Sequence, residues 1–144
     1  MKFNFKEICI GECIRKRVEE TGVSMVRICN FHQTTEEEIN TMYDQKSMDT
    51  EVLLRWCKLL EYDFFRIYCQ HLILFAPEKK SGVTVSSQEG SVPAFRKNVY
   101  TRQVIDFILE LLNTGQKTKL QIIEEYGIPK TTLYKWISKY NKMK

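Results

Sequence analysis

Residues 126–140, YGIPKTTLYKWISKY, contain the pattern that most constrains how this chain can fold. Gly127 suits the left-handed backbone of a tight turn between helices, and Pro129 suits a first helical position, where no amide donor is needed. The residues that follow place four apolar side chains at i, i+3, i+4 and i+7 on one helical face: Leu133, Trp136, Ile137 and Tyr140. The stretch predicts the turn and second helix of a helix-turn-helix.

The opposite face of this predicted helix holds hydrogen-bonding and cationic side chains and no carboxylate. Such a face suits contact with the base edges and phosphates of DNA. The side chains predicted to approach base edges are Lys130, Thr131, Thr132, Tyr134, Lys135 and Ser138, and Lys130 could instead meet a phosphate. Those predicted to meet phosphates are Lys117, Thr118, Lys119, Lys139 and Lys142. The alternative interpretation is an amphipathic surface helix that happens to be basic.

Positive charge is concentrated in the same part of the chain. The net charge is +4, but residues 1–75 carry 10 Lys/Arg and 12 Asp/Glu, whereas residues 96–144 carry 10 and 4. The first segment is therefore net −2 and the last net +6. This asymmetry is typical of a module that binds a polyanion, and a basic tail that only adds solubility is the alternative.

Several classes of protein are disfavoured by composition. No run approaches the roughly 18 apolar residues of a membrane span, and the N-terminus has no cleavable signal pattern. Five cysteines without a C-x-x-C pair predict reduced thiols in a cytoplasmic protein and no metal site. Two histidines without a nucleophile motif predict that the chain is not an enzyme, and we expect no cofactor.

The chain divides into three predicted segments, and the fold class is all-α. Residues 1–76 have the apolar spacing of five short helices, residues 77–95 have the Ser, Gly and Pro content of a linker, and residues 96–144 predict three helices. The predicted helix-starting residues are Ser24, Thr35 with Glu38, Asp49 or Thr50, Asp63, Thr101, and Thr118 with Gln121. Gly22, Gly115 and Gly127 are predicted to end helices.

The end of the first segment is rich in aromatic and aliphatic side chains. These are Tyr62, Phe64, Phe65, Tyr68, Leu72, Ile73, Leu74 and Phe75. We expect them to form either a homodimer interface or an internal core.

The N-terminal segment resembles the phage-repressor-like helix-turn-helix fold. The similarity lies in Ile10-Gly11-x-x-Ile14-Arg15-x-Arg17, in Gly22-Val23-Ser24 and in Ile28-Cys29. The resemblance implies a five-helix bundle with a recognition helix near residue 35. Residues 34–51, however, hold six acidic residues against one base, Lys46, which would repel phosphate. We therefore expect a degenerate scaffold that contacts protein more readily than DNA.

The C-terminal segment resembles the DNA-binding module of insertion-sequence transposases, including small flavobacterial proteins labelled as transposases. The matching residues are Thr131, Thr132, Leu133, Tyr134, Lys135 and Trp136, after a Tyr-Gly turn. Pro129 departs from the pattern, where that family often has Ser. The pattern of three helices, with the helix-turn-helix at the second and third, independently predicts a homeodomain-like fold, and Arg96 and Lys97 precede the first helix as a minor-groove arm would. No catalytic domain follows in the sequence, so we expect no autonomous transposition.

The residues and the resemblances together predict sequence-specific binding of double-stranded DNA. The expected roles are a bacterial transcriptional regulator or a transposase-related DNA-binding subunit. The alternative is a protein-interaction adaptor that uses the acidic, aromatic N-terminal segment.

Overall fold

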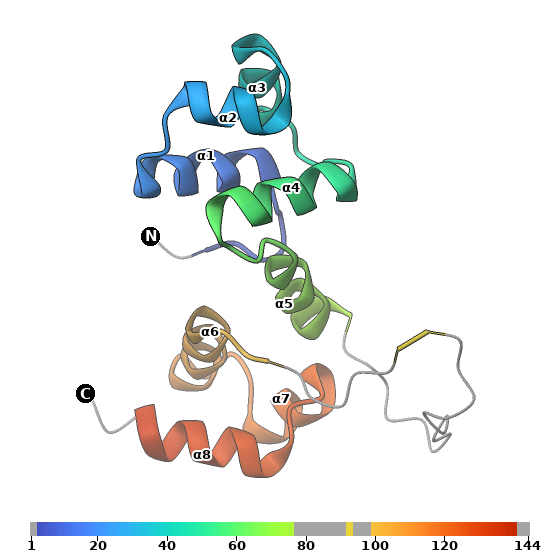
Figure 1. Ribbon diagram of the computed structural model, residues 1–144. Helices are drawn as coiled ribbons and strands as arrows, with labels where there is room; N and C mark the ends of the chain where they lie inside the picture. Colours follow the sequence, from blue (N-terminus) through green and yellow to red (C-terminus); the bar gives the residue numbers. More distant parts are fainter. Residues whose placement is uncertain (1–2, 77–91, 94–98, 141–144) are drawn as a thin grey trace. The chain divides into compact units, whose positions relative to one another are not determined.

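The computed structural model describes residues 3–76, 92–93 and 99–140 (Figure 1). Within these residues the chain forms eight α-helices and no strand, which confirms the all-α class. The helices are α1 (Ile10–Thr21), α2 (Met25–His32), α3 (Glu36–Tyr43), α4 (Thr50–Leu60), α5 (Phe65–Phe75), α6 (Arg102–Asn113), α7 (Lys119–Tyr126) and α8 (Lys130–Tyr140). No helix in this part of the chain has the length and apolar content that a membrane crossing requires.

The chain forms two compact units. The N-terminal unit is Lys6–Tyr68, and the C-terminal unit combines Met1–Phe5 with Cys69–Lys144. The division falls within α5, whereas the first domain was expected to end at residue 76. Most of the predicted linker, residues 77–91 and 94–95, lies outside the described residues.

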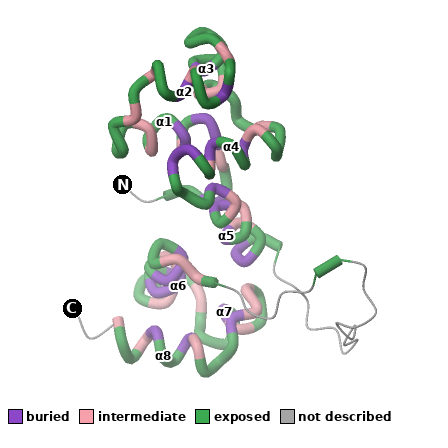
Figure 2. Tube along the Cα trace, in the orientation of Figure 1, coloured by how far each residue is buried: buried purple, intermediate pink, exposed green. Residues whose placement is uncertain are grey.

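The N-terminal unit is built around the predicted apolar stripes of α1 to α5, and Figure 2 shows their buried positions. Its buried core is Ile10, Ile14, Ile28, Ile39, Leu53, Trp56, Leu59, Leu60, Phe64 and Ile67. Ser24 and Thr35 cap α2 and α3 as predicted, and Asp49, one of the two predicted candidates, caps α4. Each of these side chains accepts a hydrogen bond from a first-turn amide. Local capping signals therefore account for these helix starts.

Helix α1 approaches the end of α3 unusually closely at Gly11. The amides of Ile10 and Gly11 donate to the carbonyls of Lys46 and Gln45, at 3.1 and 3.0 Å. A Cβ atom at Gly11 would overlap the carbonyl oxygens of Met42, Tyr43 and Gln45. These are backbone atoms that cannot rotate away, so the close approach depends on glycine.

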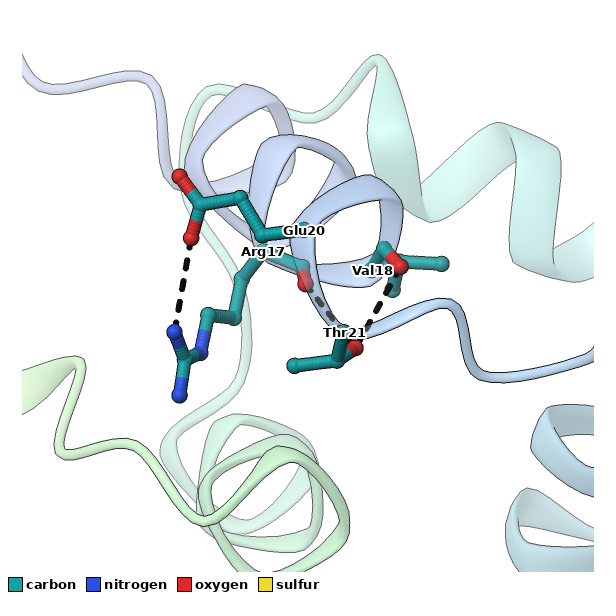
Figure 3. A network of polar contacts seen from close by, with 4 residues as sticks. All are labelled: Arg17, Val18, Glu20 and Thr21. Atoms are coloured by element: carbon teal, nitrogen blue, oxygen red, sulfur yellow. Dashed lines mark hydrogen bonds and ion pairs between the residues drawn. The ribbon is translucent and has the colours of Figure 1, made fainter.

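Side-chain bonds, drawn in Figure 3, and a left-handed glycine complete the end of α1. The Thr21 hydroxyl donates to the carbonyls of Arg17 and Val18, at 3.0 and 3.3 Å, and Arg17 pairs with Glu20 at 3.4 Å. Gly22 follows with φ at 69°, in the left-handed region that residues with a side chain rarely adopt. The prediction that Gly22 ends this helix is confirmed.

The C-terminal unit has a core assembled from three parts of the sequence. Phe5 comes from the N-terminal segment, Leu74 from α5, and the remaining buried residues from the α6–α8 region. Those remaining residues are Val104, Ile105, Ile108, Leu109, Leu111, Ile122, Ile128, Leu133 and Trp136. Residues 99–140 alone therefore do not supply the whole core.

Gln70 connects α5 to the segment that precedes α6. Its side chain is only 2% exposed, its Oε1 accepts from the Thr101 amide at 2.9 Å, and its Nε2 donates to the Val99 carbonyl. Thr101 in turn caps α6 by accepting a bond from the Val104 amide. His71 connects α5 to the N-terminal segment, because its Nδ1 donates a hydrogen bond to the Phe5 carbonyl.

The apolar residues around α5 fall into a buried group and an exposed group. Phe64, Ile73 and Leu74 are buried, whereas Tyr62, Leu72 and Phe75 are exposed. Core packing therefore accounts for the first three, and a homodimer through this region stays a prediction.

Replacement of Gln70 by Leu should weaken the start of α6. It removes the hydrogen bonds to the Val99 carbonyl and the Thr101 amide, at a net cost of about 0.5–1.5 kcal/mol for each bond. Hydrogen exchange should show faster exchange of α6 amides and unchanged exchange in α1. Gln103→Leu, at an exposed position of α6, should leave both rates unchanged. Unaltered α6 protection in Gln70→Leu would contradict this role for Gln70.

Candidate nucleic-acid interface

Helices α7 and α8 and the turn between them form the predicted helix-turn-helix element. The Thr118 hydroxyl accepts from the Gln121 amide at 3.2 Å, and Gln121 Oε1 accepts from the Thr118 amide at 2.9 Å, so the predicted capping box is confirmed. Gly127 ends α7 with φ at 63° in the left-handed region, also as predicted. Both features fix where the chain turns toward α8.

The buried face of α8 anchors it in the C-terminal unit. Leu133 and Trp136 lie in the core with Ile128 of the turn, and the Tyr100 ring meets the Trp136 ring edge-on at 4.9 Å between centroids. The helix begins at Lys130, one residue later than predicted from Pro129. Pro129 instead precedes the helix, and its carbonyl accepts the Leu133 amide at 3.0 Å.

The opposite face of α8 is open to solvent, as the mixture of buried and exposed positions along α8 in Figure 2 indicates. The predicted base-contacting residues Lys130, Thr131, Tyr134, Lys135 and Ser138 are exposed, and Thr132 is half-buried. Lys139, predicted to meet phosphate, is exposed as well. Since α8 contains no acidic residue, this face offers only hydrogen-bonding and cationic groups.

The side chains of the first residues of α7 and α8 both reach one aromatic ring. Lys119 Nζ lies 5.1 Å from the centroid of the Tyr134 ring, and Lys130 Nζ lies 5.7 Å from the same centroid. Each lysine is the first residue of its helix. One residue predicted to meet phosphate and two predicted to approach base edges therefore form a single cluster.

Lys117 has a different environment from the other lysines predicted to meet phosphate. Its ammonium group is ion-paired with Glu125 and lies 5.7 Å from the Tyr126 ring centroid. The hydrogen bond to the Glu125 carboxylate raises the pKa of Lys117. Its charge is therefore already compensated within the chain, so it offers less net attraction for a phosphate than Lys119 does.

A second aromatic–cation group lies at the end of α8, and the sequence alone did not suggest a role for all of it. The Arg102 guanidinium lies 4.1 Å from the Tyr140 ring centroid, and Lys139 Nζ lies 5.3 Å from it. Arg102 also pairs with Asp106 at 3.0 Å. The i, i+4 spacing of Arg102 and Asp106 predicts that pair, but its position beside Tyr140 depends on tertiary packing.

Three residues predicted to contact DNA fall outside the described residues: Arg96, Lys97 and Lys142. In the part of the chain that is described, no group of three His, Cys, Asp or Glu side chains could hold a metal ion.

Comparisons with protein-family models, curated proteins and solved structures return no match. The two family resemblances therefore stay predictions, and support for a function has to come from the geometry of each unit.

The N-terminal unit presents a contrasting surface at α3. Glu36, Glu37 and Glu38 occupy its first turn and are all exposed. Negative side chains are favoured at the positive end of a helix dipole, so they suit the fold locally. The same carboxylates would repel a DNA phosphate.

Truncation of Trp136 should show that the face of α8 that carries this side chain stabilises the fold. Trp136→Ala removes a side chain that is only 7% exposed, and a decrease of about 3–5 kcal/mol in the free energy of unfolding of the C-terminal unit is expected. The adjacent, exposed Lys135→Ala should change stability by less than about 0.5 kcal/mol. Chemical denaturation followed by circular dichroism provides both values. Equal effects of the two variants would contradict the assignment of the faces.

Proposed function

We propose that this protein binds double-stranded DNA sequence-specifically through the α7–turn–α8 element. The observation that carries the proposal is the exposed face of α8. This face presents Thr131, Lys135 and Ser138 together with further lysines and has no carboxylate. The opposite face of the helix is buried and anchors it in the core. DNA offers phosphate oxygens and base edges, and the exposed face is complementary to both.

In the proposed complex, α8 lies in the major groove. Thr131, Lys135 and Ser138 would approach base edges, and lysine has a preference for the guanine acceptors. Lys119 and Lys139 would neutralise phosphates on the flanks. Helices α6 to α8 would then act as a homeodomain-like module, and α1 to α5 as a repressor-like bundle whose acidic α3 stays away from the DNA.

The biological role we propose is a transcriptional regulator or a transposase-related DNA-binding subunit. A single helix-turn-helix buries little surface, so further affinity would come from a second copy or from the N-terminal unit.

A second function, protein-interaction adaptor, is supported by a separate observation. The N-terminal unit exposes the Glu36–Glu38 carboxylates, which suit a partner with basic side chains, and its Tyr62 side chain is 41% exposed. Salt dependence separates the two functions, because DNA binding releases counterions and has to weaken steeply as the salt concentration rises.

Selection from a random duplex pool tests the proposal. The full chain is compared with the double variant Lys135→Ala/Thr131→Ala, at low and at physiological salt, and the retained duplexes are sequenced. The matched control is Lys58→Ala/Ser47→Ala, which removes one ammonium group and one hydroxyl from exposed positions of the N-terminal unit.

We expect wild type and the control to enrich the same motif, and the α8 double variant to enrich none, because specific interactions with bases are worth about 1–3 kcal/mol each. An enriched motif that survives in the α8 variant would contradict the proposed readout. Absence of enrichment, with no binding at physiological salt, would favour the adaptor function.

A further inference from the structure

We infer that Tyr134 is a positioning residue that holds Lys119 and Lys130 as one phosphate-binding pair, an inference that rests on the proposed DNA binding. The two ammonium groups lie 5.1 and 5.7 Å from the same ring centroid. Both distances are within the range in which the negative face of an aromatic ring attracts a cation. The ring of Tyr134 is 44% exposed, so the cluster is accessible from solvent.

The positive charges of Lys119 and Lys130 are not compensated by carboxylates in the described part of the chain. The two distances to the shared centroid place the ammonium groups within about 11 Å of each other. A separation near this limit exceeds the Debye length of about 8 Å at physiological ionic strength, so salt largely screens the repulsion between the two groups. Within the described residues neither lysine forms an ion pair with a carboxylate, in contrast to Lys117 with Glu125. Both ammonium groups are therefore available to attract an anion.

The position of the cluster indicates which anion it would bind. Lys119 begins α7 and Lys130 begins α8, so the positive ends of two helix dipoles add to the field of the ammonium groups. Tyr134 lies on α8 beside Lys135, which we assign to base edges. A backbone phosphate next to the bases read by α8 is therefore the expected ligand.

Tyr134 contributes by ordering the two lysine side chains before DNA binds. A lysine side chain has many rotamers, and fixing it on binding costs conformational entropy. The Tyr134 ring holds both ammonium groups near one place before DNA arrives, which lowers that cost. Its hydroxyl has no part in this attraction, so phenylalanine should serve as well as tyrosine.

The test is a set of affinities of the full chain for a short duplex of fixed sequence, measured between about 50 and about 200 mM salt. The variants are Tyr134→Ala, Tyr134→Phe, Lys119→Ala/Lys130→Ala, and that double variant combined with Tyr134→Ala. Lys139→Ala with and without Tyr134→Ala is the matched control. All the substituted side chains are exposed, and circular dichroism confirms folding.

Tyr134→Ala should weaken binding at least roughly fivefold, because two lysine side chains then have to be ordered when DNA binds, and Tyr134→Phe should bind like wild type. In the chain without both lysines, Tyr134→Ala should have no further effect. In the Lys139→Ala chain its full effect should remain. Removal of both lysines should reduce the magnitude of the salt slope by about 0.9 for each phosphate that is no longer neutralised.

Three results would overturn the inference alone: an unchanged salt slope without the two lysines, a full Tyr134→Ala effect in their absence, or weakened binding by Tyr134→Phe. The second result would indicate stacking of the ring on DNA, and the third a hydrogen bond from the hydroxyl to DNA. Failure of the wild-type chain to bind any duplex would overturn the proposed function and this inference together.

Discussion

The burial of Leu133 and Trp136 is the interaction on which the proposed interface depends. A helix can present only one face to the core, so placing these two side chains inside directs Thr131, Lys135 and Ser138 outward. The tight turn at Gly127 and the buried Ile128 then set where α8 starts relative to α7. Through these constraints an apolar contact determines the surface that DNA would meet.

The core that receives α8 is itself non-local. Phe5 and Leu74 complete it from parts of the chain that precede α6, and Gln70 holds the backbone at Val99 and Thr101, where α6 is capped. A fragment restricted to the three C-terminal helices would therefore lack part of its own core. The exposed face of α8 and the end of α5 belong to one compact unit.

Features of the fold that depend on neighbouring residues follow from the sequence, whereas features that depend on tertiary packing do not. The caps at Ser24, Thr35, Asp49, Thr101 and Thr118 and the buried face of α8 follow from short-range spacing, so the sequence predicted them correctly. Spacing does not reveal that Gln70 bonds to Val99, that Glu125 compensates Lys117, or that Lys119 and Lys130 share the Tyr134 ring. Those pairings depend on tertiary packing, and they change which predicted cations are free to meet a phosphate.

The most direct measurement of the central claim is the change in backbone amide chemical shifts when a DNA duplex is added to the full, isotope-labelled chain. Contact through the exposed face of α8 predicts shifts concentrated at residues 117–119 and 130–139, with little change in α2 and α3. Shifts concentrated in α2 and α3, or none at all under conditions of measurable binding, would contradict the claim that α8 is the DNA-reading element.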